Sequence, residues 1–195
     1  QLLKSPIVSE PLGVFDCAPA SDGAAALILC SAEKAKKYTD RAIKIIASAQ
    51  SSDTLSLANR RDICTMDAVV DAGKKAFKQA NITHKDIDVM ELHDNYTIAE
   101  IVELEDLGFV KKGEGGKAVE EGRTAIDGDI PVNTSGGLKA RGNPVGATGI
   151  AQAVEIVTQL RGEADKRQIK DAKTGLTLNI GGTGGTAVVH IFEVM

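Results

Sequence analysis

One glycine-rich stretch constrains the fold of this chain more than any other: residues 133–152, which read NTSGGLKARGNPVGATGIAQ. Five glycines and a proline fall between positions 136 and 152, so this stretch cannot be one regular helix or strand. Apolar residues then recur at helical spacing, at Ile150, Val154, Val157 and Leu160, and predict a helix over 147–161. A glycine-rich loop that enters a helix presents free backbone N–H groups, which favour anions and oxyanions.

Composition and motifs exclude several classes of protein. The loop has neither the lysine of a phosphate-binding P-loop nor a dinucleotide fingerprint. The net charge of -4 and the scarcity of aromatic residues argue against a nucleic-acid partner. No apolar run is long enough to predict a membrane span. The length of 195 residues suits one domain, or one domain plus a piece of another.

The three cysteines are scattered and form no C-x-x-C pair. This pattern favours a reduced cytoplasm over a disulfide framework, and no metal site is expected. Cys30 and Cys64 are predicted to be small core residues. The chain begins without a signal peptide or an initiator methionine, which indicates a piece of a longer protein.

Hydrophobic periodicity predicts a layered α/β domain with a mixed sheet. The last two strands are close enough to form an antiparallel hairpin, and Gly108 is placed to end the preceding helix. The predicted helices cover 31–38, 65–79, 96–107 and 147–161, and the predicted strands cover 24–29, 42–48, 87–92, 176–180 and 186–194.

Three polar segments are candidates for chemistry. His93 follows the strand at 87–92, at the carboxyl end where sites collect in α/β sheets, and could donate a hydrogen bond to an oxyanion. The alternative is that Asp94 and its neighbours only cap the next helix. Asn143, in a Gly-Asn-Pro sequence, is either an oxyanion donor or part of an ordinary turn, and Asn179 opens a glycine-rich segment that could be a plain hairpin turn. His84 and His190 are interpreted as structural.

Four segments, taken in order, resemble the C-terminal half of a thiolase. They are SDGAAALIL, HDNYTIAEIVELEDLGF, the glycine-rich loop NTSGGLKARGNPVGATG and the closing NIGGTGGTAVV. The second segment is most similar to the sterol-carrier-protein type of thiolase, common in archaea, whose motif is H-D-C-F. The resemblance covers the chain from about residue 11 to residue 195.

The resemblance implies a thiolase-like fold with a five-stranded mixed sheet and helices on both faces. Residues 1–38 would end the N-terminal thiolase half, and residues 39–195 would form the C-terminal domain. The parent would join or cleave acyl-CoA or acetyl-CoA, with coenzyme A as part of the substrate and no permanently bound cofactor. It would be a homo-oligomer whose N-terminal half carries the nucleophilic cysteine, and it could take a small OB-fold partner protein. The loop glycines expected near the substrate are Gly136, Gly137, Gly142, Gly181 and Gly182.

Three amides stand where this family has proton-transfer residues: Asn143 replaces the histidine of G-H-P, while Asn95 and Asn179 replace cysteines. His93 matches the family. Three hypotheses follow: an acyltransferase half that is inactive alone, a non-catalytic acyl-CoA-binding scaffold, or a retro-aldolase half with Tyr96 as proton donor. The alternative for Tyr96 is a core aromatic residue.

Overall fold

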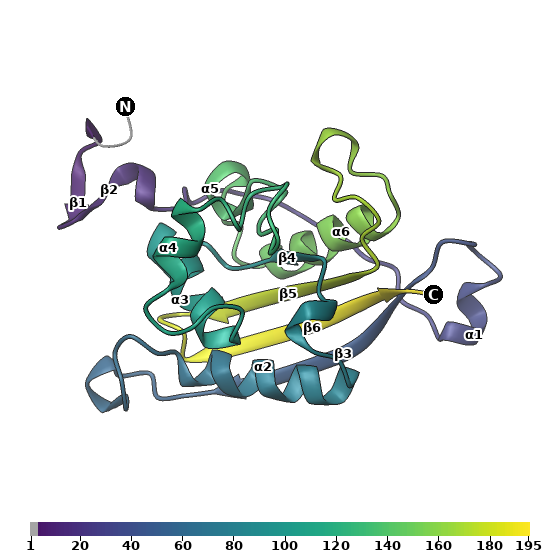
Figure 1. Cartoon of the computed structure of the whole chain (residues 1–195), viewed down its shortest axis with the longest axis horizontal. Coiled ribbons are helices and arrows are strands. Elements are labelled where there is room, and N and C mark those ends of the chain that lie inside the picture. Colours follow the sequence, from purple (N-terminus) through teal and green to yellow (C-terminus); the bar gives the residue numbers. More distant parts are fainter. Residues whose placement is uncertain (1–3) are drawn as a thin grey trace.

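A four-stranded mixed sheet lies at the centre of the computed structural model, which describes residues 4–195 (Figure 1). The strand order is β3 (Ile43–Ser52), β6 (Thr186–Val194), β5 (Thr174–Gly181) and β4 (Val89–Glu91). β6 is antiparallel to both of its neighbours, whereas β4 is parallel to β5. The predicted mixed sheet and its C-terminal hairpin are therefore confirmed.

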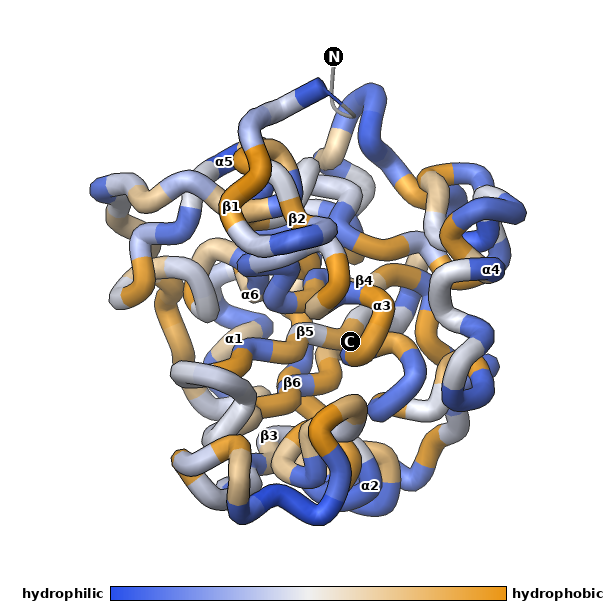
Figure 2. The backbone as a smooth tube through the Cα atoms, turned by 90° about the vertical axis from the view of Figure 1, so that its left-hand side faces the viewer, coloured by the Kyte–Doolittle hydropathy of each residue, from blue (hydrophilic) through white to orange (hydrophobic). Residues whose placement is uncertain are grey.

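Helices cover both faces of this sheet. α2 (Asp67–Ala80) packs on β3 and β6, and α3 (Thr97–Leu107) lies against α2. α6 (Thr148–Leu160) covers β4 and β5 on the opposite face. Figure 2 shows hydrophobic residues along the central strands and hydrophilic residues on the outer side of α2. The predicted helices on both faces are confirmed.

The remaining elements are short. A two-stranded hairpin near the N-terminus pairs β1 (Ile7–Ser9) with β2 (Leu12–Gly13), apart from the main sheet. The short helices are α1 (Ala32–Ala35), α4 (Gly115–Glu120) and α5 (Gly137–Arg141), with single 3-10 turns at Val14–Asp16, Leu57–Asn59, His84–Asp86 and Asp165–Arg167. Within residues 4–195, none of the helices has the length and apolarity that crossing a bilayer requires.

The predicted fifth strand, over residues 24–29, does not form in this chain, so the sheet has four strands rather than five. The segment has no regular secondary structure, and Ile28 and Leu29 are 99% and 71% exposed. Extended backbone becomes a strand only when a neighbour supplies the hydrogen-bonding ladder, and no described strand pairs with this segment. Cys30 and Cys64 are also exposed, so their predicted place in the core is wrong.

The buried face of α6 is not the one that the apolar repeat predicted. Ile150 and Val154 are 41% and 37% exposed, and only Leu160 of the repeat is buried. The inner face instead carries two buried glutamines, Gln152 and Gln159, beside small and apolar residues. Both glutamines have hydrogen-bond partners inside the fold, which removes the penalty for burying them.

Local signals placed the end of α3 and one structural histidine correctly. α3 ends at Gly108, whose φ of 88° is in the left-handed region that favours glycine. His84 Nε2 lies 2.7 Å from the carbonyl oxygen of Leu107, and its ring contacts Phe77 and Phe109. This histidine therefore packs between the ends of α2 and α3 and is structural, as predicted.

Packing between β5 and α6 leaves no room for a side chain at Gly175, because an added Cβ would collide with Ile156. Gly175→Ala should lower the free energy of unfolding by about 1–3 kcal/mol through overpacking. The control is Gly116→Ala in α4, where a Cβ would meet no described atom within 4 Å. It should raise stability by roughly 0.5–1 kcal/mol. Urea unfolding midpoints measure both, and equal midpoints would contradict this packing.

Candidate functional site

The parallel pairing of β4 with β5 places His93 beside Asn179. Glu91 is the register partner of Thr177, and His93 and Asn179 each follow two residues later. Because side chains alternate between the faces of a strand, His93 and Asn179 point to the same face as this pair. That face is covered by α6.

Hydrogen bonds join these two residues to α6. Asn179 Nδ2 lies 3.0 Å from His93 Nδ1 and 3.1 Å from Gln152 Oε1. Gln152 is fully buried, and its Nε2 donates to the carbonyl oxygens of Leu92 and Leu178, each at 2.9 Å. One chain of side chains therefore connects the helix with the carboxyl ends of both strands.

His93 is held as a neutral imidazole. It is 6% exposed, and its backbone N–H donates to Glu103 Oε2 at 2.9 Å. Burial, and then the positive charge of Arg141, lower the pKa of His93 to about 4. A neutral imidazole can donate one hydrogen bond without bringing a positive charge into the site.

Asp94 caps a helix, but not the one that follows it. Its carboxylate oxygens accept hydrogen bonds from the backbone N–H groups of Leu138, at 2.7 Å, and Lys139, at 3.3 Å. These groups lie in the first turn of α5, whereas the N-cap of α3 is Tyr96. Asp94 thus fastens the glycine-rich loop to the end of β4, and burial raises its pKa from the usual carboxyl value.

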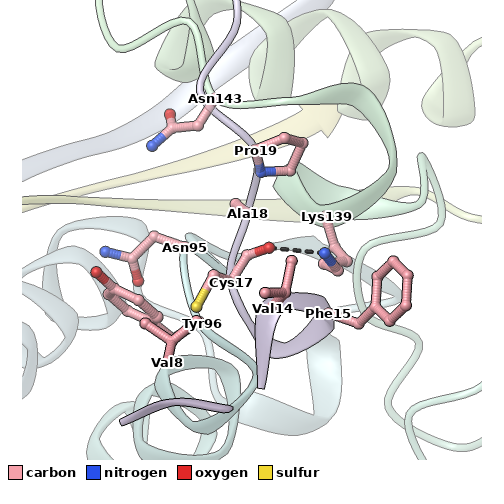
Figure 3. Close-up of a pocket in the computed structure, with 10 residues that line it drawn as sticks. All are labelled: Val8, Val14, Phe15, Cys17, Ala18, Pro19, Asn95, Tyr96, Lys139 and Asn143. Atoms are coloured by element: carbon pink, nitrogen blue, oxygen red, sulfur yellow. Dashed lines mark hydrogen bonds between the residues drawn. The ribbon is translucent and has the colours of Figure 1, made fainter. Parts of the chain in front are cut away.

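Asn95, Tyr96 and Asn143 line one open cavity of about 810 Å³. Figure 3 shows these side chains around the segment that carries Cys17, whose carbonyl oxygen accepts a hydrogen bond from Lys139 Nζ at 2.6 Å. Tyr96 is 46% exposed, so the alternative of a core aromatic residue is wrong, and its role as a proton donor stays a prediction.

The N-terminal segment holds the two amides of this cavity in place. Ala18 N–H donates to the carbonyl oxygen of Asn95, and Asn143 N–H donates to that of Pro19, each at 2.9 Å. Thr148 Oγ1, in the first turn of α6, donates to Asn143 Oδ1 at 2.8 Å and leaves the amide nitrogen of Asn143 as a donor. The five predicted residues therefore form two neighbouring groups, joined by the first turn of α6 and the end of β4.

The predicted loop glycines lie in two regions of the structure, at the two ends of α5 and at the end of β5. They are Gly136, Gly137, Gly142, Gly181 and Gly182. At Gly137 a Cβ would collide with the carboxylate of Asp94, and at Gly142 it would collide with Ser21. These contacts give both positions a structural reason for glycine, and substrate binding by the loops stays a prediction.

Sequence reasoning missed the carboxylate of Glu91. It is fully buried, accepts hydrogen bonds from Ser135 Oγ at 2.7 Å and Ser135 N at 3.1 Å, and pairs with Arg141 at 3.4 Å. Burial raises the pKa of Glu91 to about 7. The signal was a glutamate in the apolar run Val-Met-Glu-Leu, as Gln152 was a glutamine in an apolar helix. Nowhere in residues 4–195 do three or more His, Cys, Asp or Glu side chains gather to hold a metal ion.

The chain has a layered α/β fold with a polar site at the carboxyl ends of β4 and β5. Comparison with known proteins identifies the family that has this fold. The "Thiolase C-terminal domain-like" family model matches residues 49–194, so the chain belongs to this family. The match lies within the predicted domain of residues 39–195. The predicted boundary after residue 38 stays a prediction, and residues 1–3 of the preceding segment lie outside the described residues.

Curated relatives agree with the family. The acetyl-CoA acetyltransferases of Methanothermobacter thermautotrophicus and Methanocaldococcus jannaschii are 61% and 49% identical over 99% of the chain. Sterol carrier protein 2 of Oryctolagus cuniculus is 39% identical over 100% of this chain, and the aligned part makes up 36% of that protein's length. The chain spans 50% and 51% of the two archaeal relatives, about half of their length.

Two solved structures share the fold. An Ltp2-ChsH2(DUF35) aldolase has a TM-score of 0.83 at 24% identity, with 97% of this chain and 50% of that chain covered. The Bacillus anthracis acetyl-CoA acetyltransferase has a TM-score of 0.59 at 19% identity, with 85% of this chain and 34% of that chain covered. At these identities the likeness concerns the fold alone.

Gly137→Ala tests whether the close contact with Asp94 organises the loop. Gly137 and Gly182 have φ values of 63° and 60°, but a Cβ at Gly182 would meet no described atom within 4 Å. Gly182→Ala should therefore lower the free energy of unfolding by only about 1–2 kcal/mol, the cost of placing an alanine in a left-handed backbone conformation. Gly137→Ala should lower the free energy of unfolding by roughly 1–3 kcal/mol more, because the Asp94 carboxylate must move. Chemical unfolding of both variants measures this difference, and equal losses would contradict the contact.

The neutral state of His93 should make stability depend on pH. The unfolded chain takes up a proton at His93 below pH 6.5, whereas the folded chain does so only near pH 4. The contribution of His93 to the free energy of unfolding is therefore fully present above pH 6.5. It is lost as the pH falls from 6.5 to 4, and the loss is at most about 3 kcal/mol. Urea unfolding of wild type and His93→Asn across this range should show a shrinking difference. Parallel curves would contradict the lowered pKa.

Proposed function

We propose that this chain is the C-terminal half of an acyl-CoA acyltransferase, which makes or cleaves the carbon–carbon bond next to a thioester carbonyl. Its substrate would be acetyl-CoA or another acyl-CoA, with coenzyme A as part of the substrate and no permanently bound cofactor. The supporting observation is the neutral His93, fixed by Asn179, two residues before an amide that lines the cavity.

The chemistry suits these groups. Thioester condensation and thiolysis place negative charge on a carbonyl oxygen, as an enolate or as a tetrahedral intermediate. His93, Asn95 and Asn143 can donate hydrogen bonds to such an oxygen, but the amides of Asn95 and Asn143 cannot move a proton at neutral pH. We infer, as the resemblance to thiolases implies, that the nucleophile and the proton-transfer groups of the acyltransferase come from an N-terminal half outside these 195 residues.

Two exposed apolar surfaces support an N-terminal thiolase-like half as the partner. The outward face of α6 carries Ile150 and Val154, and residues 24–29 form no regular secondary structure, with Ile28 fully open to solvent. Exposed apolar surfaces of this kind favour a contact with another polypeptide. We also infer a homo-oligomeric parent and a small OB-fold partner protein. A cytoplasmic location agrees with the three unpaired cysteines.

Tyr96 supports a second candidate function. Its half-exposed side chain lines the same cavity as Asn95 and Asn143. A phenol there could protonate the enolate left when a retro-aldol cleavage breaks the carbon–carbon bond of a β-hydroxyacyl-CoA. The third candidate, a non-catalytic acyl-CoA-binding scaffold, needs no proton transfer and is favoured by the three amides.

Thiolysis of acetoacetyl-CoA by free CoA tests the proposal. We expect the chain to be inactive alone and active when completed by the N-terminal half of its 61% identical Methanothermobacter relative. His93→Ala should then lower kcat roughly 100- to 1,000-fold, because one oxyanion donor is lost. His84→Gln alters a histidine outside the site and should keep kcat.

The outcomes separate the three candidates. Full activity of His93→Ala would overturn the role of His93. Cleavage of a β-hydroxyacyl-CoA without thiolysis, abolished by Tyr96→Phe, would identify the retro-aldolase. Binding of acyl-CoA with neither reaction in the completed protein would identify the scaffold and overturn the acyltransferase.

A further inference from the structure

The orientation of the buried Gln152 side chain follows from its surroundings. One end of its amide lies 2.9 Å from the carbonyl oxygens of both Leu92 and Leu178. Carbonyl oxygens only accept hydrogen bonds, so this end must be the NH2 group. The reverse orientation would place three acceptors together in a buried site, with no proton between them. Gln152 Oε1 therefore faces Asn179.

The same reasoning fixes Asn179. Gln152 Oε1 is an acceptor, so the atom of Asn179 that lies 3.1 Å away must be its NH2 nitrogen. That nitrogen carries two protons, and its second neighbour is His93 Nδ1 at 3.0 Å. A proton on His93 Nδ1 would place two donors face to face. Nδ1 must therefore accept, and the single proton of the neutral ring lies on Nε2.

We propose that Gln152 is a positioning residue which, through Asn179, holds His93 in the Nε2–H tautomer. The backbone carbonyls of Leu92, directly after β4, and of Leu178, in β5, anchor the chain of hydrogen bonds, because a carbonyl oxygen can only accept. No hydrogen bond from residues 4–195 reaches His93 Nε2, so its proton is available to a ligand. The tautomer stands without any enzymatic activity, and only its use on a thioester oxygen rests on the proposed function.

This arrangement explains why an amide suits position 179. Asn179 donates two hydrogen bonds from one nitrogen, to Gln152 and to His93. A cysteine thiol has a single weak donor and could not serve both neighbours. The asparagine that resembles a lost acid/base residue thus gains a definite role, which is to set where the proton of His93 sits.

Nitrogen-15 NMR of the labelled chain tests the proposal directly, because the two ring nitrogens of a neutral histidine differ strongly in chemical shift according to which one is protonated. Single substitutions of the other two histidines, His84 and His190, assign the signals. In wild type we expect His93 to show an unprotonated Nδ1 and a protonated Nε2 near neutral pH. A protonated Nδ1 would overturn the proposal.

Two variants then probe the chain of hydrogen bonds. Asn179→Asp replaces the donor by an acceptor of nearly the same shape and should move a proton onto His93 Nδ1. Gln152→Met removes the amide at similar volume and should give a mixture of tautomers. The matched control is Gln159→Met, which removes a second buried glutamine of α6 that does not contact Asn179. The control should keep the wild-type tautomer.

A wild-type tautomer in Asn179→Asp or Gln152→Met would overturn the role of the altered residue. Should Gln152→Met fail to fold, the exchange of the Gln152 side-chain NH2 protons in wild type decides the matter. Slow exchange supports the two bonds to the strand carbonyls, and exchange at the rate of an exposed glutamine overturns them. None of these measurements needs substrate, so a failure here is distinct from an absence of thiolysis.

Discussion

The parallel register between β4 and β5 is the constraint on which the candidate site depends. It pairs Glu91 with Thr177, and it therefore brings His93 level with Asn179 at the carboxyl ends of the strands. A slip of one residue would turn the whole set of side chains on one strand to the opposite face. The opposite face is an apolar core that includes Leu92 and Leu178, so such a slip would bury charged groups among hydrocarbon. Burial of the hydrophobic face of the sheet thus fixes the register between β4 and β5, and this register places the polar side chains together on the other face.

The polar face has its own energetic requirement. A buried polar group left without a partner costs about 1–3 kcal/mol, so pairing such groups within the fold stabilises it. Glu91 is paired with Ser135 and Arg141, and Gln152 with two strand carbonyls and Asn179. These bonds also tie the glycine-rich loop and α6 to β4 and β5. The same contacts that satisfy buried polar atoms therefore set the position and protonation of His93.

The sequence predicted elements where the controlling interaction is local. The end of α3 at Gly108 depends on one backbone conformation, and the C-terminal hairpin depends on two alternating strands with a short turn. Prediction failed at residues 24–29 and on α6, where apolar residues that were predicted to be buried are exposed. Both errors have one physical origin: an apolar pattern predicts burial, but it does not say whether this chain or another polypeptide provides the cover. Glu91 and Gln152 were missed because their partners are far away in the sequence.

The amides make chemical sense once their neighbours are considered. Asn179 gives both of its N–H bonds to fixed acceptors, so it orients His93 and is not itself a free donor. Asn143 has its Oδ1 engaged by Thr148 and presents its N–H groups instead. With His93 neutral, His93 and the amides offer donors to developing negative charge, but none of them takes up a proton near neutral pH. In the proposed acyltransferase, the proton would then be moved by Tyr96 or by a residue of the polypeptide that we propose covers α6, so the identity of that polypeptide would decide the chemistry.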